Sequence, residues 1–499
     1  MRRPPGRGVL AAVSCATFLT ALDATVVTVA LPQLRRELHL HQADLEWVAA
    51  GYPLAYASLL LIGGRTADQH GHRTTLLTGT ALFTAASILC ALAPTGTLLI
   101  AGRLLQGAAA ALIFPAALAV VTHDLPDTLR TTGVGLLTAT VAVALATGPV
   151  ISGVITEHLG WPWLFALNVP LAAAAWATLW ATMPRPPTGR PHPAHDAHDT
   201  PLDLALVCLA LAGCAYSLIE RHRQGPASPA IWTAWSITAA ALTYVVIHQA
   251  TTPTRLPAIT LLRNRTYAGG ITAQLLWGLG VNGMFFFTAP YLTHTAGLTP
   301  TTAGLAFTPI AATLLLLTPL LPKAITRYGP RTTVTTGLAT IATGMAYLAY
   351  LAPTPHLPLL LTGLALLGAG SALTIPLTTH ALTNTPHTHA ATAAGLYTAT
   401  REASGTLGIA IIGAITTLPA TNHPIEWAHT YRTALTTAAI LITTAIPPAW
   451  WALTPHHPTP KPTTPHPHPD TTPHTKPPDP GPDTHPGPST DPSTGTGTT

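Results

Sequence analysis

Residues 97–122 read TLLIAGRLLQGAAAALIFPAALAVVT, and Arg103 is the only charged side chain among them. About 20 apolar residues, each rising 1.5 Å, cross the hydrocarbon core of a bilayer, so this stretch is typical of a membrane-spanning helix. Similar runs recur along the 499 residues, of which 48% are hydrophobic and only 8% are charged. Soluble proteins carry about 25% charged residues. The sequence therefore predicts an all-α integral membrane protein.

Fourteen apolar runs are long enough to span. They are residues 8–32, 45–63, 74–93, 97–122, 131–156, 163–183, 202–219, 230–249, 267–293, 302–321, 332–352, 357–382, 392–418 and 431–453. The first run could instead belong to a cleaved signal peptide, because it follows two arginines. Its length, its internal Asp23 and the lack of a convincing cleavage site favour a spanning helix.

The distribution of Lys and Arg predicts the orientation, since cytoplasmic loops of membrane proteins are enriched in both. If the amino terminus lies inside, sixteen of the 23 Lys and Arg residues fall in cytoplasmic segments, five in outer segments and two within spans. Both termini are therefore expected in the cytoplasm of a bacterial plasma membrane, which requires an even number of spans. The net charge of +5 is small, and no basic stripe suggests nucleic-acid binding.

Two hydrophilic segments interrupt or follow the spans. Residues 184–201 are rich in Pro, His and Asp and are expected to form a cytoplasmic linker, and residues 454–499 a disordered cytoplasmic tail. We expect no specific metal site from their histidines. The four cysteines lie in apolar runs without a metal or redox spacing, so we interpret them as small core residues.

An internal repeat relates the two ends of the chain. Residues 30–32 match 288–290 and residues 71–74 match 329–332 at an offset of 258, 112–115 match 373–376 at 261, and 135–140 match 395–400 at 260. Chance similarity between Ala- and Gly-rich helices is the alternative, but the matches keep their order. We therefore expect a six-helix bundle in residues 1–183, an inserted helix pair in 202–250 and a second six-helix bundle in 251–453. Parallel repeats of this kind occur in rocking transporters, with the substrate site between the halves.

The loop after the second span carries charged residues and glycines at close spacing. Gly64 lets helices approach each other, and Gly71 permits a tight turn. Asp68 can pair with a loop arginine, such as Arg65 or Arg73, or with a helix amino terminus. Such a latch can hold one conformation and release in another, although an ordinary positive-inside loop would have a similar composition.

This loop resembles the signature of the major facilitator superfamily, Gly-x-Leu-Ala-Asp-Arg-x-Gly-Arg-Arg/Lys, from which Thr66 and Gln69 depart. The resemblance implies two six-helix bundles, here with two inserted helices. Arg103 lies in a segment similar to the superfamily's span-four Arg-x-x-Gln-Gly motif, which is implicated in proton transfer. An arginine in hydrocarbon must face a partner or water. Its repeat counterpart is Leu364, so packing alone does not require the charge; a structural ion pair is the alternative.

Span five contains a segment that is similar to the drug-antiporter signature Gly-x-x-x-Gly-Pro-x-x-Gly-Gly. Gly148, Pro149 and Gly153 match it, whereas Ala144 and Ser152 replace two glycines by other small residues. Glycine and proline bend a helix and permit close packing. The resemblance implies export, and a plain packing face is the alternative.

Residues 22–32 read LDATVVTVALP and resemble the Leu-Asp-x-Thr-Val-Val-Asn-Val-Ala-Leu-Pro signature of the fourteen-span drug:proton antiporters of the EmrB/QacA type. Thr28 replaces the usual Asn. Residues 161–170 resemble a second segment of that family, with Pro162 in place of an arginine. Competition between a proton and a substrate for Asp23 would give antiport directly; a static pair with Arg103 is the alternative.

Arg401 and Glu402 lie within span thirteen, where the first half has Val141 and Ala142. An acid in mid-membrane is a candidate functional site, so Glu402 is expected to be a second proton or cation site, unless it only pairs with Arg401.

Taken with the resemblance, these residues predict proton-coupled efflux of drugs or other small amphipathic or cationic molecules. An importer or exporter of one metabolite, without multidrug activity, is the alternative. No Gly-x-x-x-x-Gly-Lys-Ser/Thr loop occurs, so the proton gradient is expected to supply the energy, with no cofactor. The expected partners are the substrate, protons and the lipid bilayer, and the protein is expected to be a monomer. A membrane enzyme would cluster its His and Asp near one interface, and a sensor would carry a folded soluble domain.

Overall fold

The structure is a computed structural model that describes residues 5–183, 201–251, 261–262, 264–383, 390–419 and 423–453. Met1–Thr454 form one unit of the chain and Pro455–Thr499 a second. The predicted linker, apart from Pro201, and the predicted tail lie outside the described residues.

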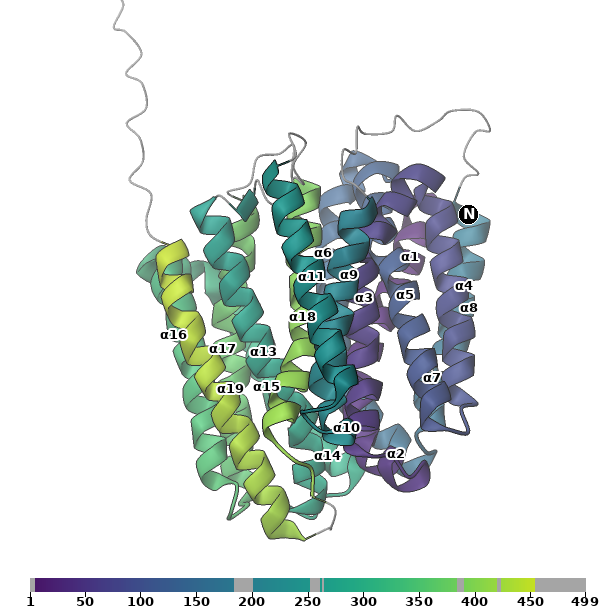
Figure 1. The fold of residues 1–499 in the computed structure, drawn as a ribbon. Coiled ribbons are helices and arrows are strands. Elements are labelled where there is room, and N and C mark those ends of the chain that lie inside the picture. Colours follow the sequence, from purple (N-terminus) through teal and green to yellow (C-terminus); the bar gives the residue numbers. More distant parts are fainter. Residues whose placement is uncertain are drawn as a thin grey trace, which may run out of the picture. The chain divides into compact units, whose positions relative to one another are not determined.

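The described residues form helices and no strands (Figure 1). The first part of the chain contains α1 (Pro5–Val26), η1 (Thr28–Ala30), α2 (Leu31–Glu37), α3 (Gln42–His70), α4 (His72–Ala91), α5 (Gly96–Ala119), η2 (Val120–Asp124), α6 (Asp127–His158), α7 (Pro162–Ala166) and α8 (Asn168–Thr182). A middle part contains α9 (Pro201–Ile219), α10 (Arg221–Gln224) and α11 (Pro229–Thr251). The last part contains α13 (Arg265–His294), α14 (Pro300–Ala306), α15 (Thr308–Leu317), η3 (Thr318–Leu320), α16 (Leu321–Leu351), α17 (Leu357–Thr383), α18 (Ala390–Ile415) and α19 (Pro424–Ala452).

Twelve stretches of the described residues are long and apolar enough to cross a membrane. One of them, Pro300–Leu351, is 52 residues long. The prediction of an all-helical, multi-pass membrane protein is therefore confirmed. α9 and α11 coincide closely with the seventh and eighth predicted spans. The first predicted span is not one regular helix, because α1 ends at Val26 and a short 3-10 turn leads into α2.

Local sequence explains several helix ends. The Thr95 side chain caps α5 by accepting from the backbone N–H of Leu98, and the Asn264 side chain caps α13. Gly71 ends α3 with a φ of +87°, and its repeat counterpart Gly329 has a φ of +78° within α16. Positive φ favours glycine. The turn predicted at Gly71 is thus present, and the repeat preserves it.

The helices of the first and last parts pack by the same plan. In the first part α3 packs on α5, α4 on α5 and α8, and α1 on α6 and α8. In the last part α15 packs on α17, α16 on α17 and α19, and α13 on α18 and α19. Each pair in the second list corresponds to a pair in the first through the sequence repeat. The repeat therefore extends from residue matches to helix packing.

Two helix pairs make most of the contact between the first and last parts, and we call them the seams. At one seam α3 packs against α18, and at the other α6 packs against α14. These pairs are reciprocal in the repeat. The middle helices α9 and α11 pack on each other, and α9 also contacts both α3 and α18, so this pair covers the first seam (Figure 1).

The helix ends define two faces of the bundle. The N-terminal face carries the start of α1, and the α2 face carries α2, α10 and α14, which lie at the bottom of Figure 1. At the α2 face, Arg35 Nη2 donates to Pro419 O at 2.8 Å and the N–H of Leu418 donates to Gln42 Oε1 at 2.8 Å. Glu157 Oε2 accepts from the N–H of Thr301 at 2.8 Å across the other seam. Both seams are therefore held together by polar bonds at this face.

Candidate functional site

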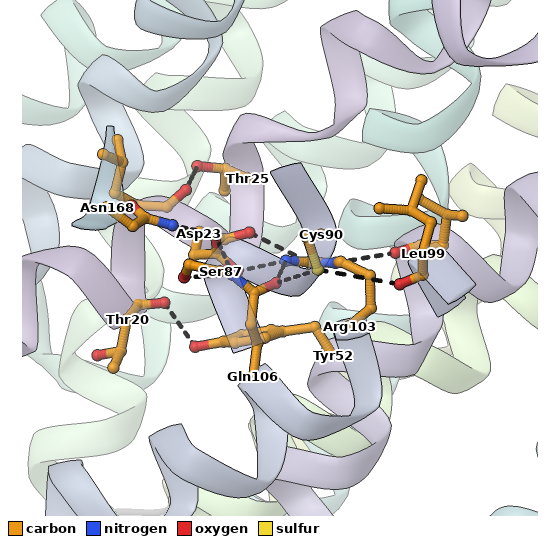
Figure 2. A network of polar contacts seen from close by, with 12 residues as sticks. Thr20, Asp23, Thr25, Tyr52, Ser87, Cys90, Leu99, Arg103, Gln106 and Asn168 are labelled. Carbon is orange, nitrogen blue, oxygen red and sulfur yellow. Dashed lines mark hydrogen bonds and ion pairs between the residues drawn. The ribbon is translucent and has the colours of Figure 1, made fainter. Parts of the chain in front are cut away.

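Asp23 of α1 and Arg103 of α5 form an ion pair in which both side chains are fully buried (Figure 2). Arg103 Nη1 binds Asp23 Oδ2, and Nη2 donates to the Asp23 carbonyl oxygen at 3.2 Å. Arg103 Nε donates to Val48 O of α3 at 3.2 Å. Each charge lies on an apolar helix that carries no opposite charge nearby, so the two meet across helices. The structure therefore brings together two of the residues that the sequence singled out for proton coupling.

Two amides complete this network. Asn168 Nδ2, at the start of α8, donates to Asp23 Oδ1 at 2.8 Å. Gln106 Nε2 donates to the same oxygen at 3.3 Å and to Ser87 Oγ at 2.9 Å, while its Oε1 accepts from Arg103 Nη1 at 2.9 Å. Asp23 thus accepts from side chains of α5 and α8. Sequence reasoning assigned no role to Gln106 or Asn168, although both stand in segments quoted for the family resemblance.

Aromatic rings enclose the guanidinium. The Arg103 Cζ lies 4.8 Å from the ring centroid of Tyr52 and 5.8 Å from that of Phe165. The Tyr52 hydroxyl donates to Thr20 O at 2.7 Å, which fixes the ring beneath the pair (Figure 2). Such contacts stabilise a cation that has lost its water. In this conformation Asp23 and Arg103 share one site, and neither is exposed.

This arrangement gives protonation a structural consequence. The buried pair is neutral as a unit, and breaking such a pair by neutralising one partner leaves an uncompensated charge, at a cost of about 3–5 kcal/mol. A proton on Asp23 would leave Arg103 with the oxygens of Val48, Gln106 and the Asp23 backbone as partners. Protonation of Asp23 would therefore favour a conformation in which Arg103 reaches water or another anion.

The second predicted pair lies within α18. Arg401 Nε and Nη2 donate to Glu402 Oε1 at 3.0 and 2.6 Å. The Arg401 side chain is 37% exposed and the Glu402 side chain 12% exposed, whereas both side chains of the first pair are fully buried. Tyr56 of α3 lies within electrostatic range of both residues, and Tyr52 within range of both Glu402 and Asp23. The two pairs are separate, and Tyr52 lies within electrostatic range of both.

Two side chains of the loop motif bind residues outside it. Arg73 donates from Nε to Met183 O and from Nη2 to Trp180 O, each at 3.1 Å, and so binds the end of α8. His72 Nδ1 lies 3.1 Å from Asp124 Oδ2. Gly71 provides the turn described above. Gly64, Arg65 and Asp68 occupy the last two turns of α3.

The glycines of the span-five motif lie at close helix contacts of α6. A Cβ on Gly148 would lie 2.1 Å from Thr25 Oγ1 of α1, two residues from Asp23. A Cβ on Gly153 would lie 2.3 Å from Pro300 O of α14, at a seam. Pro149 lies between them, inside the helix. The motif therefore positions α6 against the helix of Asp23 on one side and against the second half on the other.

Comparison with known proteins agrees with this fold. A family model described as the Major Facilitator Superfamily matches residues 13–409 and, in a second match, residues 275–480. The chain is 32% identical over 444 residues to the cephamycin export protein CmcT of Amycolatopsis lactamdurans, a match that covers 86% of this chain and 88% of that protein. It is 30% identical to the multidrug resistance protein Stp of Mycobacterium tuberculosis, over 81% of this chain and 75% of that protein.

Solved structures show a similar fold. A bacterial homologue of the human lysosomal transporter Spinster superposes with a TM-score of 0.64 at 16% identity, covering 91% of this chain and 98% of the other. The POT family transporter PepTSo superposes with a TM-score of 0.63 at 15% identity, covering 90% of this chain and 99% of the other. The chain therefore belongs to the major facilitator superfamily, and it is a membrane transporter rather than an enzyme.

Proposed function

We propose that this protein exports small molecules, of the class of antibiotics and other drugs, in exchange for protons. Relatives of comparable length are named for cephamycin export, for multidrug resistance and for methylenomycin A resistance, the last at 31% identity in Streptomyces coelicolor. The motifs in residues 22–32 and 144–153 support placement among the drug:proton antiporters of the EmrB/QacA type.

The observation that carries the proposal is the buried Asp23–Arg103 pair with its two amides. Asp23 can be bound by Arg103 or by a proton, and the two compete. A proton releases Arg103 and so changes which helix arrangement is stable. Arg401 and Glu402 supply a second, more exposed pair, where a cationic part of a substrate could compete with Arg401 for the carboxylate.

Alternating access follows from the two seams. Rocking of the first bundle against the second would open one face while the other stays closed. The excess of Lys and Arg in the loops supports placing the N-terminal face in the cytoplasm and the α2 face outside the plasma membrane. The polar bonds at the α2 face then close the route to the outside. Protons from outside would reach Asp23 only after these bonds part.

Helix lengths support fourteen spans rather than twelve. At 1.5 Å per residue, the 52 residues of Pro300–Leu351 would extend about 78 Å, more than twice the roughly 30 Å of a hydrocarbon core. This stretch therefore supplies two spans. The 26-residue helix α18 adds one more to the twelve stretches. The proposed bundles are residues 1–183 and 251–453, with the pair in 202–250 inserted between them, and the proposed working unit is a monomer.

Transport in proteoliposomes tests the proposal. We expect an imposed pH gradient, acidic on the side of the α2 face, to drive the wild-type protein to export compounds of a drug panel. The substitution Asp23→Asn should abolish this gradient-driven export. Gradient-driven movement of compound in the opposite direction would support an importer instead. Export that is unchanged in Asp23→Asn would refute the role of the pair.

A further inference from the structure

A second buried carboxyl lies at the seam between α3 and α18. Glu46, in the second turn of α3, has no exposed surface. Its Oε1 accepts from Gln42 Nε2 at 2.7 Å, and its Oε2 has no hydrogen-bond partner among the described residues. The carboxyl group lies against Gly413 of α18, where an added Cβ would be 2.5 Å from Oε1 and 2.9 Å from Oε2. This contact exists only while the seam is closed.

The repeat shows that packing does not require an acid here. At the offset of 258, Glu46 corresponds to Gly304 of α14, and at 260 Gly153 corresponds to Gly413. At the second seam these two glycines meet directly, since a Cβ on Gly304 would lie 3.3 Å from Gly153 Cα. The equivalent contact is thus made by two glycines at one seam and by a carboxyl group and a glycine at the other.

Neighbouring charges do not compensate a negative charge on Glu46. Glu220, which follows α9, carries the same sign and accepts from Trp47 Nε1 at 3.0 Å. Arg223 of α10 binds Asp44, and its Nη1 lies 3.8 Å from Glu220 Oε2. His222 Nε2 is bound to Gly413 O at 2.7 Å.

The remaining charged groups on the elements packed against this end of α3 bind elsewhere or lie far along their helices. On α2, Arg35 binds Pro419 O, and Glu37 binds Gln33 and Trp161. Arg103 of α5 binds Asp23. On α18, Arg401 and Glu402 precede Gly413 by 12 and 11 residues, and Asp203 lies in the first turn of α9, at its other end. Arg36 of α2 is exposed. An isolated buried carboxylate is costly, and such groups neutralise instead.

We propose that Glu46 is a proton-binding site of the gate at the α2 face, and that this gate closes only when Glu46 is protonated. Protonated Glu46 fits against Gly413, whereas ionised Glu46 favours separation of α3 from α18, which returns the carboxylate to water. Gln42 links the carboxyl group of Glu46 to the closed seam. Its amide nitrogen donates to Glu46 Oε1, Gly413 O and Thr416 O, and its Oε1 accepts from the N–H of Leu418. The proton is exchanged with the outer solution and is distinct from the one that Asp23 binds.

The gate can be measured by pulsed electron paramagnetic resonance in lipid nanodiscs without substrate. Spin labels at Arg36 of α2 and Ile425 of α19, both exposed, report the distance between the two halves at this face, with the four native cysteines replaced by serine. We expect the open-to-closed ratio to rise with pH. One proton contributes at most about a tenfold change in this ratio per pH unit, and Glu46→Gln should remove that contribution.

Two further variants keep the test decisive. Glu157→Gln alters an acid at the same face but at the other seam. Because the bond from Thr301 N–H lowers the pKa of Glu157, its titration does not make the open-to-closed ratio rise with pH, so that rise should persist in Glu157→Gln. Gly413→Ala should raise the open fraction at every pH and move the half-closed point to lower pH, because it disfavours the closed contact while Glu46 still titrates. Any of three results would overturn the inference. The first is a pH response that is unchanged in Glu46→Gln, and the second is a loss of the pH response in Glu157→Gln as large as in Glu46→Gln. The third is a Gly413→Ala protein that is no more open than wild type.

The inference rests on the alternating access proposed above, but its measurement needs neither a gradient nor a substrate. If gradient-driven export fails while the pH-dependent gate persists, only the proposed function is refuted. If export depends on Asp23 while the gate ignores Glu46, only the inference is refuted.

Discussion

The Asp23–Arg103 pair offers a test of whether a buried charge pair is needed for folding or for transport. In Asp23→Asn the side chain keeps one oxygen but replaces the other by an amino group. In the native site one carboxylate oxygen binds Arg103 and the other binds the amides of Gln106 and Asn168. An asparagine cannot accept on both sides, so one donor must face another donor.

The magnitude follows from burial. Both side chains have no exposed surface, so removing one charge leaves the other uncompensated, which costs about 3–5 kcal/mol. Arg103→Gln should cost a similar amount. In the double variant Asp23→Asn/Arg103→Gln no buried charge remains, and the loss is that of one or two hydrogen bonds, about 1–3 kcal/mol. We therefore expect the double variant to be more stable than either single variant.

Unfolding in detergent micelles, followed by tryptophan fluorescence, measures these differences, and gradient-driven export in proteoliposomes measures function. The double variant should recover stability without recovering transport. If its destabilisation equals the sum of the two single values, the charges do not depend on each other and the interpretation of the site is wrong. If it exports normally, the pair has no part in coupling.

Three other substitutions test separate contacts. Asn168→Leu removes a donor to a charged acceptor while keeping the size of the side chain, and it should lower the free energy of unfolding by about 1.5–3 kcal/mol and slow gradient-driven export. Gly148→Ala places a Cβ 2.1 Å from Thr25 Oγ1 and should cost about 1–3 kcal/mol, part of which Thr25→Ala should restore, as unfolding of the double variant would show. Gly71→Ala forces alanine to a φ of +87° and should lower the free energy of unfolding by about 1–3 kcal/mol. Gly135→Ala places its Cβ in open space and should not destabilise the protein, and a comparison of the two unfolding midpoints checks this.

The apolar runs of the sequence predicted an all-helical membrane protein, and a pair between Asp23 and Arg103 was one of the two alternatives that the sequence left open, for a physical reason. In hydrocarbon a charge needs a partner, and only a few ionisable residues lie inside the apolar runs. The same rule identified Arg401 and Glu402, which are adjacent and bind each other. Glycines at 71 and 329 were predictable because the turn appears in both copies of the repeat.

The amides and Glu46 were not predictable in the same way. A glutamine or asparagine in an apolar run carries no charge, so its partner on another helix cannot be inferred from spacing. Glu46 stands one residue inside the predicted span 45–63, a position where carboxylates ordinarily face water. It is buried because Gly413 docks on it from far along the chain. Such a contact depends on how the two bundles meet, which no local pattern encodes.

The repeat shows that packing does not demand the charges that we propose to act in transport. Arg103 corresponds to Leu364, and the pair Arg401–Glu402 corresponds to Val141 and Ala142. At each of these positions the other bundle is built with an uncharged residue. The helical frame is therefore close to symmetric, while the ionisable groups on it are not.

This asymmetry makes a last prediction about α18. In Arg401→Val/Glu402→Ala the helix receives the residue types of its counterpart. Because the two side chains bind each other on one helix and are partly exposed, their removal leaves no buried charge on another helix, and we expect a stability change of about 0–1 kcal/mol. Export of cationic compounds should nevertheless fall, whereas export of uncharged compounds should persist, if Glu402 receives the cation. Equal loss for both classes of compound would show that the pair serves coupling rather than recognition, and a large loss of stability would show that the bundles depend on it for assembly.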